Sequence, residues 1–273
     1  MKRSTEASRD LCKGRFADAT KESGGKVLKY RSRMVAKGYS MVQGEHYGKR
    51  SFPTPCTMTI LGFFLLATFY DLVLGKFDVG TAYIEATVAE EGMKPTYLVP
   101  PFGFEEEGYV WEMVRALYGR PDAGQKWWAK VLVPFMLACG FEQHIAFPCF
   151  FFRYKSGLSK PDIAFVHVDD ITVGFATEDA KEEFKRAGEK RFKVFKSEKP
   201  TGVVGIDIDD SRHPSKGRTI KLHQENFIRE ASERLKTKDL PSVDSPWLLP
   251  GTREGVQSVL EEFSPFRITS VVS

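Results

Sequence analysis

Alternating apolar and polar residues mark one part of the chain as a pair of strands. From Asp162 to Phe175, two runs rich in Val, Ile and Phe alternate with a period of two, which is typical of β-strands. Only Asp169 and Asp170 separate the runs, so the pattern predicts a tight antiparallel hairpin with both acids at its tip. A turn relaxes the opposite orientation of neighbouring strand side chains, which allows both carboxylates to lie near one site. A purely structural turn is the alternative, because Asp is a common turn residue.

Periodic apolar residues predict further elements on both sides of this hairpin. Strands are expected at 26–38, where cationic and apolar residues alternate, at 72–79, and at 203–208. Helices are expected at 57–70, 122–140, 177–194 and 224–236, the first three capped by Thr57, Asp122 and Thr177. The most apolar run, 60–75, is too short for a membrane span of ~20 residues and is interpreted as a buried helix followed by a strand. Irregular alternation of strands and helices favours the α+β class with an antiparallel sheet.

Composition places few limits on function. The 273 residues are 42% hydrophobic and 28% charged, which is ordinary for a soluble globular protein with a sizeable core. The net charge of +4 does not demand a nucleic-acid partner, although the segments 13–50 and 181–199 are locally basic. The four cysteines show no C-x-x-C pairing, and the N-terminus lacks an apolar signal sequence, so an intracellular protein with reduced thiols is expected. Residues 1–25 are polar and are expected to form a leader or linker, with disorder as an alternative.

A third acid suggests a chemical role for the pair Asp169 and Asp170. Asp78 closes the predicted strand at 72–79, where its side chain can project from the end of a sheet. Clustered carboxylates repel each other unless a cation lies between them, and Mg²⁺ prefers oxygen ligands, usually one or two carboxylates plus substrate phosphates. Taken alone, an Asp at a strand end is more often a cap or a turn residue. The magnesium interpretation therefore requires tertiary folding to bring Asp78 to the hairpin.

Several blocks of sequence resemble motifs of reverse transcriptases from copia-type LTR retrotransposons. Phe-Asp-Val-Gly-Thr-Ala-Tyr at 77–83 resembles the first catalytic motif, and His-Val-Asp-Asp at 167–170 resembles the Val-Asp-Asp motif. Arg-Ser-Arg-Met-Val-Ala-Lys-Gly-Tyr at 31–39 and Ala-Leu-Tyr-Gly-Arg-Pro-Asp-Ala-Gly-Gln-Lys-Trp-Trp at 116–128 are similar to two further blocks of that family. Shorter matches, all in family order, are Leu98–Phe104, Gly140-Phe141, Pro148-Cys149 and Gly205-Ile206.

The resemblance implies a fold, an activity and a set of site residues. The fold implied for residues 26–235 is an α+β right-hand polymerase with an antiparallel palm sheet, fingers and a partial thumb. The implied activity is RNA-directed DNA polymerisation, a nucleotidyl transfer that uses two Mg²⁺ ions, with Mn²⁺ as an alternative. The implied residues are Asp78, Asp169 and Asp170 for catalysis and metal binding, the Val79 carbonyl as a further metal ligand, Arg33, Val79 and Tyr83 for the nucleotide, and Gly205 and Ile206 for the primer grip. Tyr83 matches the aromatic gate that excludes a 2′-hydroxyl, with a core aromatic residue as the structural alternative.

The same resemblance implies partners and a cellular setting. The partners are an RNA or DNA template-primer, deoxynucleoside triphosphates, and other Pol segments such as RNase H and integrase or a second subunit; no membrane is implied. The implied location is intracellular, in cytoplasmic virus-like particles or the nucleus. Residues 236–273 are expected to be a C-terminal tail or a truncated connection, because the region after Pro250 is too short for RNase H. The chain is interpreted as a polymerase fragment of a larger polyprotein or as a stranded genomic copy.

Some positions depart from the family pattern. His167 replaces the usual Tyr or other apolar aromatic residue before Val-Asp-Asp, which bears on primer handling. Asp122 and Gly124 replace the commoner Gln and Pro, so no template or nucleotide contact is assigned to 116–128, and Trp127 and Trp128 are assigned to packing. One alternative function is a catalytically inactive remnant that binds nucleic acid or protein. A palm-type nucleotide cyclase would share the three acids but would not explain the blocks at 29–39 and 116–128.

Overall fold

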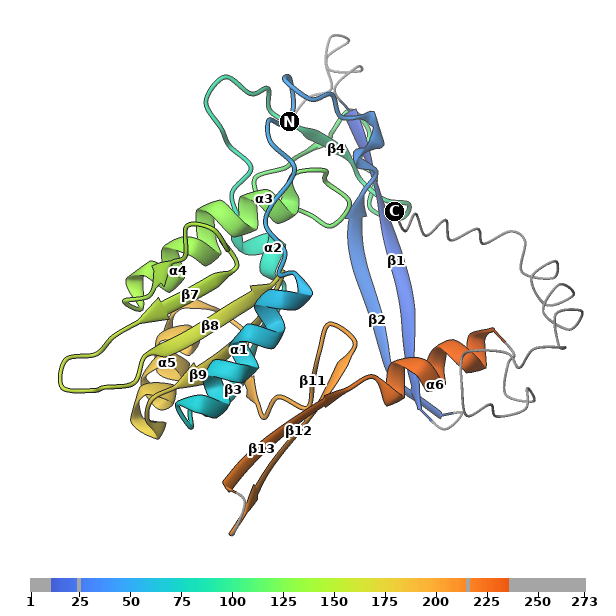
Figure 1. The fold of residues 1–273 in the computed structure, drawn as a ribbon. Coiled ribbons are helices and arrows are strands. Elements are labelled where there is room, and N and C mark those ends of the chain that lie inside the picture. The colour runs from blue at the N-terminus through green and yellow to red at the C-terminus, as the bar shows by residue number, and fades with distance from the viewer. Residues whose placement is uncertain (1–10, 24–25, 215–216, 236–273) are drawn as a thin grey trace, which may run out of the picture. The chain divides into compact units, whose positions relative to one another are not determined.

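A six-stranded antiparallel sheet carries the predicted hairpin near its centre (Figure 1). The structure is a computed structural model that describes residues 11–23, 26–214 and 217–235. Within that part of the chain, the order of the sheet is β10-β3-β9-β8-β7-β6. The strands are β3 (Val73–Val79), β6 (Glu142–Gln143), β7 (Phe150–Arg153), β8 (Asp162–His167), β9 (Asp170–Phe175) and β10 (Phe195–Glu198). The predicted strand at 72–79 thus lies directly beside the second strand of the hairpin.

Helices cover both faces of this sheet, so its central strands β8 and β9 are buried on both sides. On one face, α1 (Thr57–Phe69) packs Phe63 and Phe64 against Ile163 and Phe165. The other face is covered by α5 (Glu178–Arg191) and by a helical segment formed by α3 (Ala123–Trp127), η3 (Trp128–Leu132) and α4 (Val133–Ala138). Alternation along β3 sends Phe77 and Val79 to this second face and Lys76 and Asp78 to the first.

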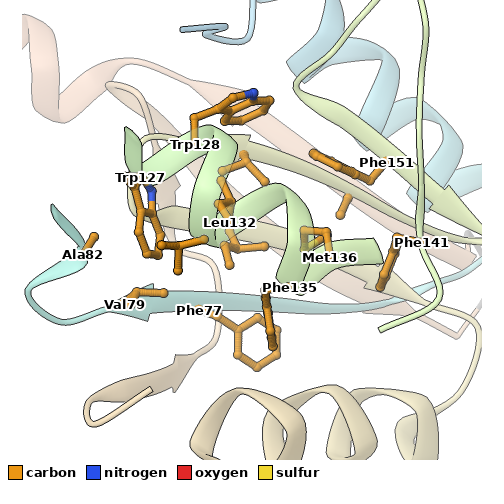
Figure 2. Packing of buried hydrophobic residues seen from close by; sticks show 14 of the residues in the cluster. Phe77, Val79, Ala82, Trp127, Trp128, Leu132, Phe135, Met136, Phe141 and Phe151 are labelled. Carbon is orange, nitrogen blue, oxygen red and sulfur yellow. The ribbon is translucent and has the colours of Figure 1, made fainter. Parts of the chain in front are cut away.

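The segment from α3 to α4 packs into the hydrophobic core on the second face of the sheet. Figure 2 shows Trp127 and Leu132 of this segment packing over Phe77 and Val79 of β3. Trp127 is fully buried and Trp128 nearly so, which agrees with the packing role expected for them. The middle turn, η3, is a π-helix, and Pro134 follows it. Proline lacks the main-chain donor of a regular helix and its ring crowds the preceding turn, which accounts for the wider turn here.

A second sheet contains a strand in a region expected to be a leader or linker. Its order is β2-β1-β4-β5, from β1 (Leu11–Ser23), β2 (Lys26–Ala36), β4 (Tyr97–Val99) and β5 (Trp111–Glu112). The prediction for 1–25 is wrong for residues 11–23, because β1 pairs along its length with β2 and at its start with β4. Residues 1–10 and 24–25 lie outside the described part of the chain. The strand expected at 26–38 is confirmed as β2.

A small third sheet corrects the strand predicted at 203–208. It contains β11 (Gly202–Val203), β12 (Ile206–His213) and β13 (Gly217–His223) in that order. Val204 and Gly205 form the two-residue turn between β11 and β12, both with positive φ angles, of 48° and 75°. This is the pattern of a type I′ hairpin turn, which Gly accepts readily and a β-branched residue does not. The pattern predicted one strand because Gly205 is flanked by apolar residues on both sides.

Three helix predictions need smaller corrections. The N-cap of α1 is Cys56 rather than Thr57, and α1 is only half buried, since Met58, Leu65 and Phe69 are each more than 70% exposed. Asp122 precedes α3 but makes no side-chain capping hydrogen bond. The cap predicted at Thr177 is confirmed, because its side chain accepts a hydrogen bond from the Ala180 amide, but α5 ends at Arg191, before Val194.

The remaining elements are short. They are η2 (Gly38–Ser40), α2 (Ala82–Glu85) and α6 (Glu225–Arg234). Helix α6 confirms the helix expected at 224–236 and belongs to a second unit that begins at Gln224. The tail expected at 236–273 lies outside the described residues, and the domain boundaries at 25/26 and 235/236 stay predictions. No helix in the described ranges combines the length and apolar character needed to cross a bilayer.

Candidate active site

Two of the three predicted carboxylates face each other across neighbouring strands. Asp78 on β3 lies directly opposite Asp170 on β9 in the antiparallel register. Residues paired in this way project from the same face of the sheet, with Cβ atoms about 5 Å apart. Both side chains are only partly buried, so solvent reaches them. Asp78 thus meets the hairpin as the magnesium interpretation requires.

The third carboxylate, Asp169, lies in the turn of the hairpin. The turn is formed by Val168 and Asp169, so the sequence placed it one residue too late, and Asp170 is the first residue of β9. Val168 has a φ angle of 61°, a left-handed conformation that is unfavourable for a β-branched residue. Its carbonyl oxygen accepts a hydrogen bond from the indole Nε1–H of Trp127, at 2.7 Å. This bond fixes the turn that presents Asp169.

Electrostatic repulsion among the acids is visible at Asp169. Burial raises the pKa of its carboxyl group, and the charges of Asp170 and Asp78 raise it further, while His167 and a backbone hydrogen bond act in the opposite direction. The main-chain amide of Val79 also points to this turn, 3.4 Å from the Asp169 carbonyl oxygen. Three negative groups are therefore held together against their mutual repulsion, which a bound cation would relieve.

The donor chemistry of this cluster suits a magnesium ion. Three carboxylates and the nearby main chain of Val79 offer only oxygen ligands, the type that Mg²⁺ prefers. The side chains do not converge on one point: in the part of the chain that the structure describes, no three Asp, Glu, His or Cys side chains form a metal-binding group. Asp170 Oδ2 pairs with the Lys76 ammonium group, at 3.4 Å. The residues fit the ion by chemistry, and Asp170 would have to turn to bind it.

A stack of side chains leads from the carboxylates to the second sheet. Tyr83, on α2, is half buried, and burial, the charge of Asp169 and the neighbouring Tyr118 raise the pKa of its phenol. The Tyr83 and Tyr118 rings are 4.9 Å apart, and the guanidinium of Arg33 lies 4.9 Å from the centre of the Tyr118 ring. Arg33 and Tyr83, both expected at the nucleotide, are thus joined through Tyr118. Tyr118 was not among the predicted site residues, although the block at 116–128 that contains it resembles a family motif.

The blocks at 31–39 and 116–128 contact each other through their main chains. The Ala36 amide donates to the Tyr118 carbonyl oxygen at 2.8 Å. A Cβ atom added to Gly119 would lie 2.1 Å from the Ala36 oxygen, and one added to Gly38 would lie 2.2 Å from the Gly119 oxygen. Only glycine permits so close an approach. The block at 31–39 is thereby fixed to the block at 116–128, which positions Arg33.

A buried ionic network supports the block at 116–128. The guanidinium of Arg120 donates to both carboxylate oxygens of Asp122, at 2.6 and 3.3 Å, to the Thr96 hydroxyl and to the His46 carbonyl oxygen. Lys126 pairs with the same Asp122 carboxylate and with Glu90. The side chains of Arg120, Asp122 and Lys126 are each 1% exposed. The negative charge of Asp122, which stands where the commoner pattern has Gln, is therefore balanced by two buried cations.

Comparison with known proteins identifies the family. The family described as reverse transcriptase (RNA-dependent DNA polymerase) matches residues 12–248. The chain belongs to the reverse transcriptase family. The resemblance to copia-type retrotransposon reverse transcriptases is thus confirmed, and so is the expected enzyme class of RNA-directed DNA polymerases.

Curated relatives come from plant transposons. The chain is 26% identical over 229 residues to the Retrovirus-related Pol polyprotein from transposon TNT 1-94 of Nicotiana tabacum, which covers 83% of this chain and 17% of the relative. It is 27% and 28% identical over 154 residues to the Pol polyproteins from transposons RE2 and RE1 of Arabidopsis thaliana, covering 55% of this chain and 10% of each relative. The reverse transcriptase chain thus spans less than a fifth of these polyproteins.

The remaining predicted site residues lie at the β11–β12 turn. Gly205 is the second residue of that turn and Ile206 begins β12. The Lys76 side chain links this hairpin to the acids, because its ammonium group pairs with Asp170 and donates to the Gly202 carbonyl oxygen of β11, at 3.3 Å. Lys76 was not among the predicted site residues, although the two-residue spacing from Asp78 places both on one face of β3.

We expect Trp127→Phe to slow primer extension about tenfold and to lower the free energy of unfolding by about 1–2 kcal/mol, the typical loss of a buried hydrogen bond. The substitution keeps an aromatic ring in the core and removes the bond to Val168, so the turn carrying Asp169 becomes less well positioned. Trp128→Phe is the matched control, since Trp128 is also buried and has no comparable bond to the turn among the described contacts. Extension kinetics and urea unfolding measure both effects; equal slowing by the two substitutions would contradict the positioning role.

Proposed function

We propose that the chain extends a primer by RNA-directed DNA polymerisation through two-metal nucleotidyl transfer, as part of a longer Pol polyprotein. In this proposal, the six-stranded sheet with its covering helices is the palm, and the sheet β2-β1-β4-β5 belongs to the fingers of a right-hand polymerase. The observation that carries the proposal is the register that sets Asp78 opposite Asp170, beside Asp169. Three carboxylates from segments far apart in sequence meet at one edge of a rigid sheet.

The chain's own residues have distinct roles in the proposed reaction. Asp78, Asp169 and Asp170 provide the negative charge that holds two Mg²⁺ ions, or Mn²⁺, with the Val79 carbonyl as a further ligand. When bound, such ions supply charge stabilisation to the attacking 3′-hydroxyl and the leaving pyrophosphate. Little covalent chemistry remains for the protein, so catalysis depends on positioning.

The nucleotide and primer positions in this proposal come from the family resemblance. Arg33 contributes positive charge for the triphosphate, and Tyr83, beside Asp169, excludes a 2′-hydroxyl from the incoming nucleotide. Gly205 and Ile206 present the main chain of the β11–β12 turn to the primer end. The template-primer, the nucleotides and the other Pol segments or a second subunit are the proposed partners, and the intracellular location is part of the same proposal.

Primer extension tests the proposal directly. The purified chain is incubated with an RNA template, a labelled DNA primer, four deoxynucleoside triphosphates and Mg²⁺. We expect extension by the wild type and none by Asp78→Asn, which keeps the size of the side chain and removes one ligand charge. Duplex binding without extension by the wild type would favour the alternative, an inactive remnant that binds nucleic acid.

A further inference from the structure

Lys76 connects one of the three carboxylates to the neighbouring sheet. It lies on β3, two residues before Asp78, and its side chain is 22% exposed. The ammonium group is 3.4 Å from Asp170 Oδ2 and 3.3 Å from the Gly202 carbonyl oxygen on β11. One cation therefore binds both a proposed metal ligand and the strand that leads into the β11–β12 turn.

The register of β3 and β9 explains how Lys76 reaches Asp170. Lys76 is directly opposite Thr172, so Asp170 is its diagonal neighbour on the same face. Diagonal neighbours across an antiparallel pair are about 7–8 Å apart at the backbone, a distance that a lysine side chain can span. The contact thus orients the Asp170 carboxylate along the sheet toward Lys76.

Thr172 offers Lys76 a second polar partner. Thr172 is 1% exposed, and its hydroxyl has no hydrogen-bond partner among the described residues. A buried hydroxyl without a partner is costly, so an approaching ammonium group would be stabilised there. When Asp170 turns toward a cation, the Lys76 ammonium group can exchange Asp170 for Thr172, and this movement changes its bond to the Gly202 carbonyl oxygen.

We propose that Lys76 is a positioning residue that competes with a divalent cation for the Asp170 carboxylate and couples that competition to the β11–β12 hairpin. The inference rests on the proposed function of the three carboxylates. Binding of a cation at Asp170 releases the Lys76 ammonium group from the carboxylate. Because the same group binds Gly202, the order of the proposed primer grip then depends on whether the ion is bound.

Direct measurement of Mn²⁺ binding by electron paramagnetic resonance tests the competition. We expect Lys76→Met to bind Mn²⁺ about three- to tenfold more tightly than the wild type, as the loss of a partly exposed competing charge predicts. Lys76→Arg keeps the charge and should restore affinity close to that of the wild type.

Lys196→Met is the matched control for charge alone. Lys196 lies opposite Asp78 on β10 but is exposed, and the structure assigns it no contact with Asp170. Since exposed charges are screened, this control should change the affinity by less than about twofold. Unchanged or weaker binding by Lys76→Met, or an equal gain in Lys196→Met, would overturn the inference.

A second readout follows the hairpin, and a third variant separates this inference from the proposed function. Amide hydrogen exchange at 203–207 should change on addition of Mn²⁺ in the wild type and not in Lys76→Met, which lacks the bond to Gly202; the same response in both proteins would overturn the proposed coupling. If Asp169→Asn binds Mn²⁺ as tightly as the wild type, the metal site itself fails, and the proposed function fails with it. If Asp169→Asn weakens binding and Lys76→Met leaves it unchanged, only the role of Lys76 fails.

Discussion

Asp169→Asn is expected to abolish primer extension while making the folded protein more stable. Metal-assisted charge stabilisation is worth several kcal/mol, and each ~1.4 kcal/mol is a factor of ten, so the loss should be on the order of 10³-fold. Stability should rise because the charged form of Asp169 is disfavoured in the fold: burial and the charges of Asp170 and Asp78 raise its pKa. Asn keeps the shape of the side chain and removes the charge.

The opposite signs of the two effects make this test specific. Extension is measured with Mg²⁺, and unfolding by urea at neutral pH with EDTA present, so that cation binding does not stabilise the wild type. Asp179→Asn, an exposed acid at the start of α5, is the control and should leave extension unchanged. Extension by Asp169→Asn near the wild-type rate, or a fall in its unfolding midpoint, would contradict the site described above.

Arg120→Met should be among the most destabilising single substitutions in the chain, at about 3–5 kcal/mol, the cost of breaking a buried ion pair from one side. It removes the bidentate partner of Asp122, whose carboxylate is 1% exposed, and leaves the Thr96 hydroxyl and the His46 carbonyl oxygen without this donor. Methionine fills much of the same volume, so most of the loss would come from the broken ion pair and its hydrogen bonds, with Lys126 as the remaining cation at Asp122.

An exposed ion pair provides the control for Arg120. Arg191 pairs with Glu85 at 3.3 Å, and its side chain is 45% exposed. Arg191→Met should cost at most about 1 kcal/mol, because surface ion pairs are screened by solvent. Urea denaturation of both variants gives the comparison, and similar losses for the two would mean that burial does not govern the strength of the Arg120 network.

Local patterns were enough to locate the elements that carry the acids. Strand alternation predicted β3, β8 and β9, because apolar strands in a two-sided core leave a clear signal. Asp78 was identified as the third acid from its place near the end of β3 and from the family resemblance. The cap at Thr177 was predictable because capping depends on adjacent residues. These features can be predicted from neighbouring residues in the sequence, without information on distant contacts.

Long-range pairing explains most of what the sequence did not reveal. Residues 11–23 are too polar to be recognised as a strand, and β1 forms because β2 and β4 supply partners. Asp122 was expected to cap a helix, but Arg120 and Lys126 bind its carboxylate instead. The contacts of Lys76 with Asp170 and of Tyr118 with Arg33 join residues far apart in sequence, so no local pattern predicts them.

The close approach of Gly38 and Gly119 has a consequence for how related genomic copies can be interpreted. Any side chain at either position would force two main-chain segments apart. A copy that no longer experiences selection can lose this pair as readily as its acidic motifs. Retention of both glycines in a diverged copy would indicate recent selection for a folded product.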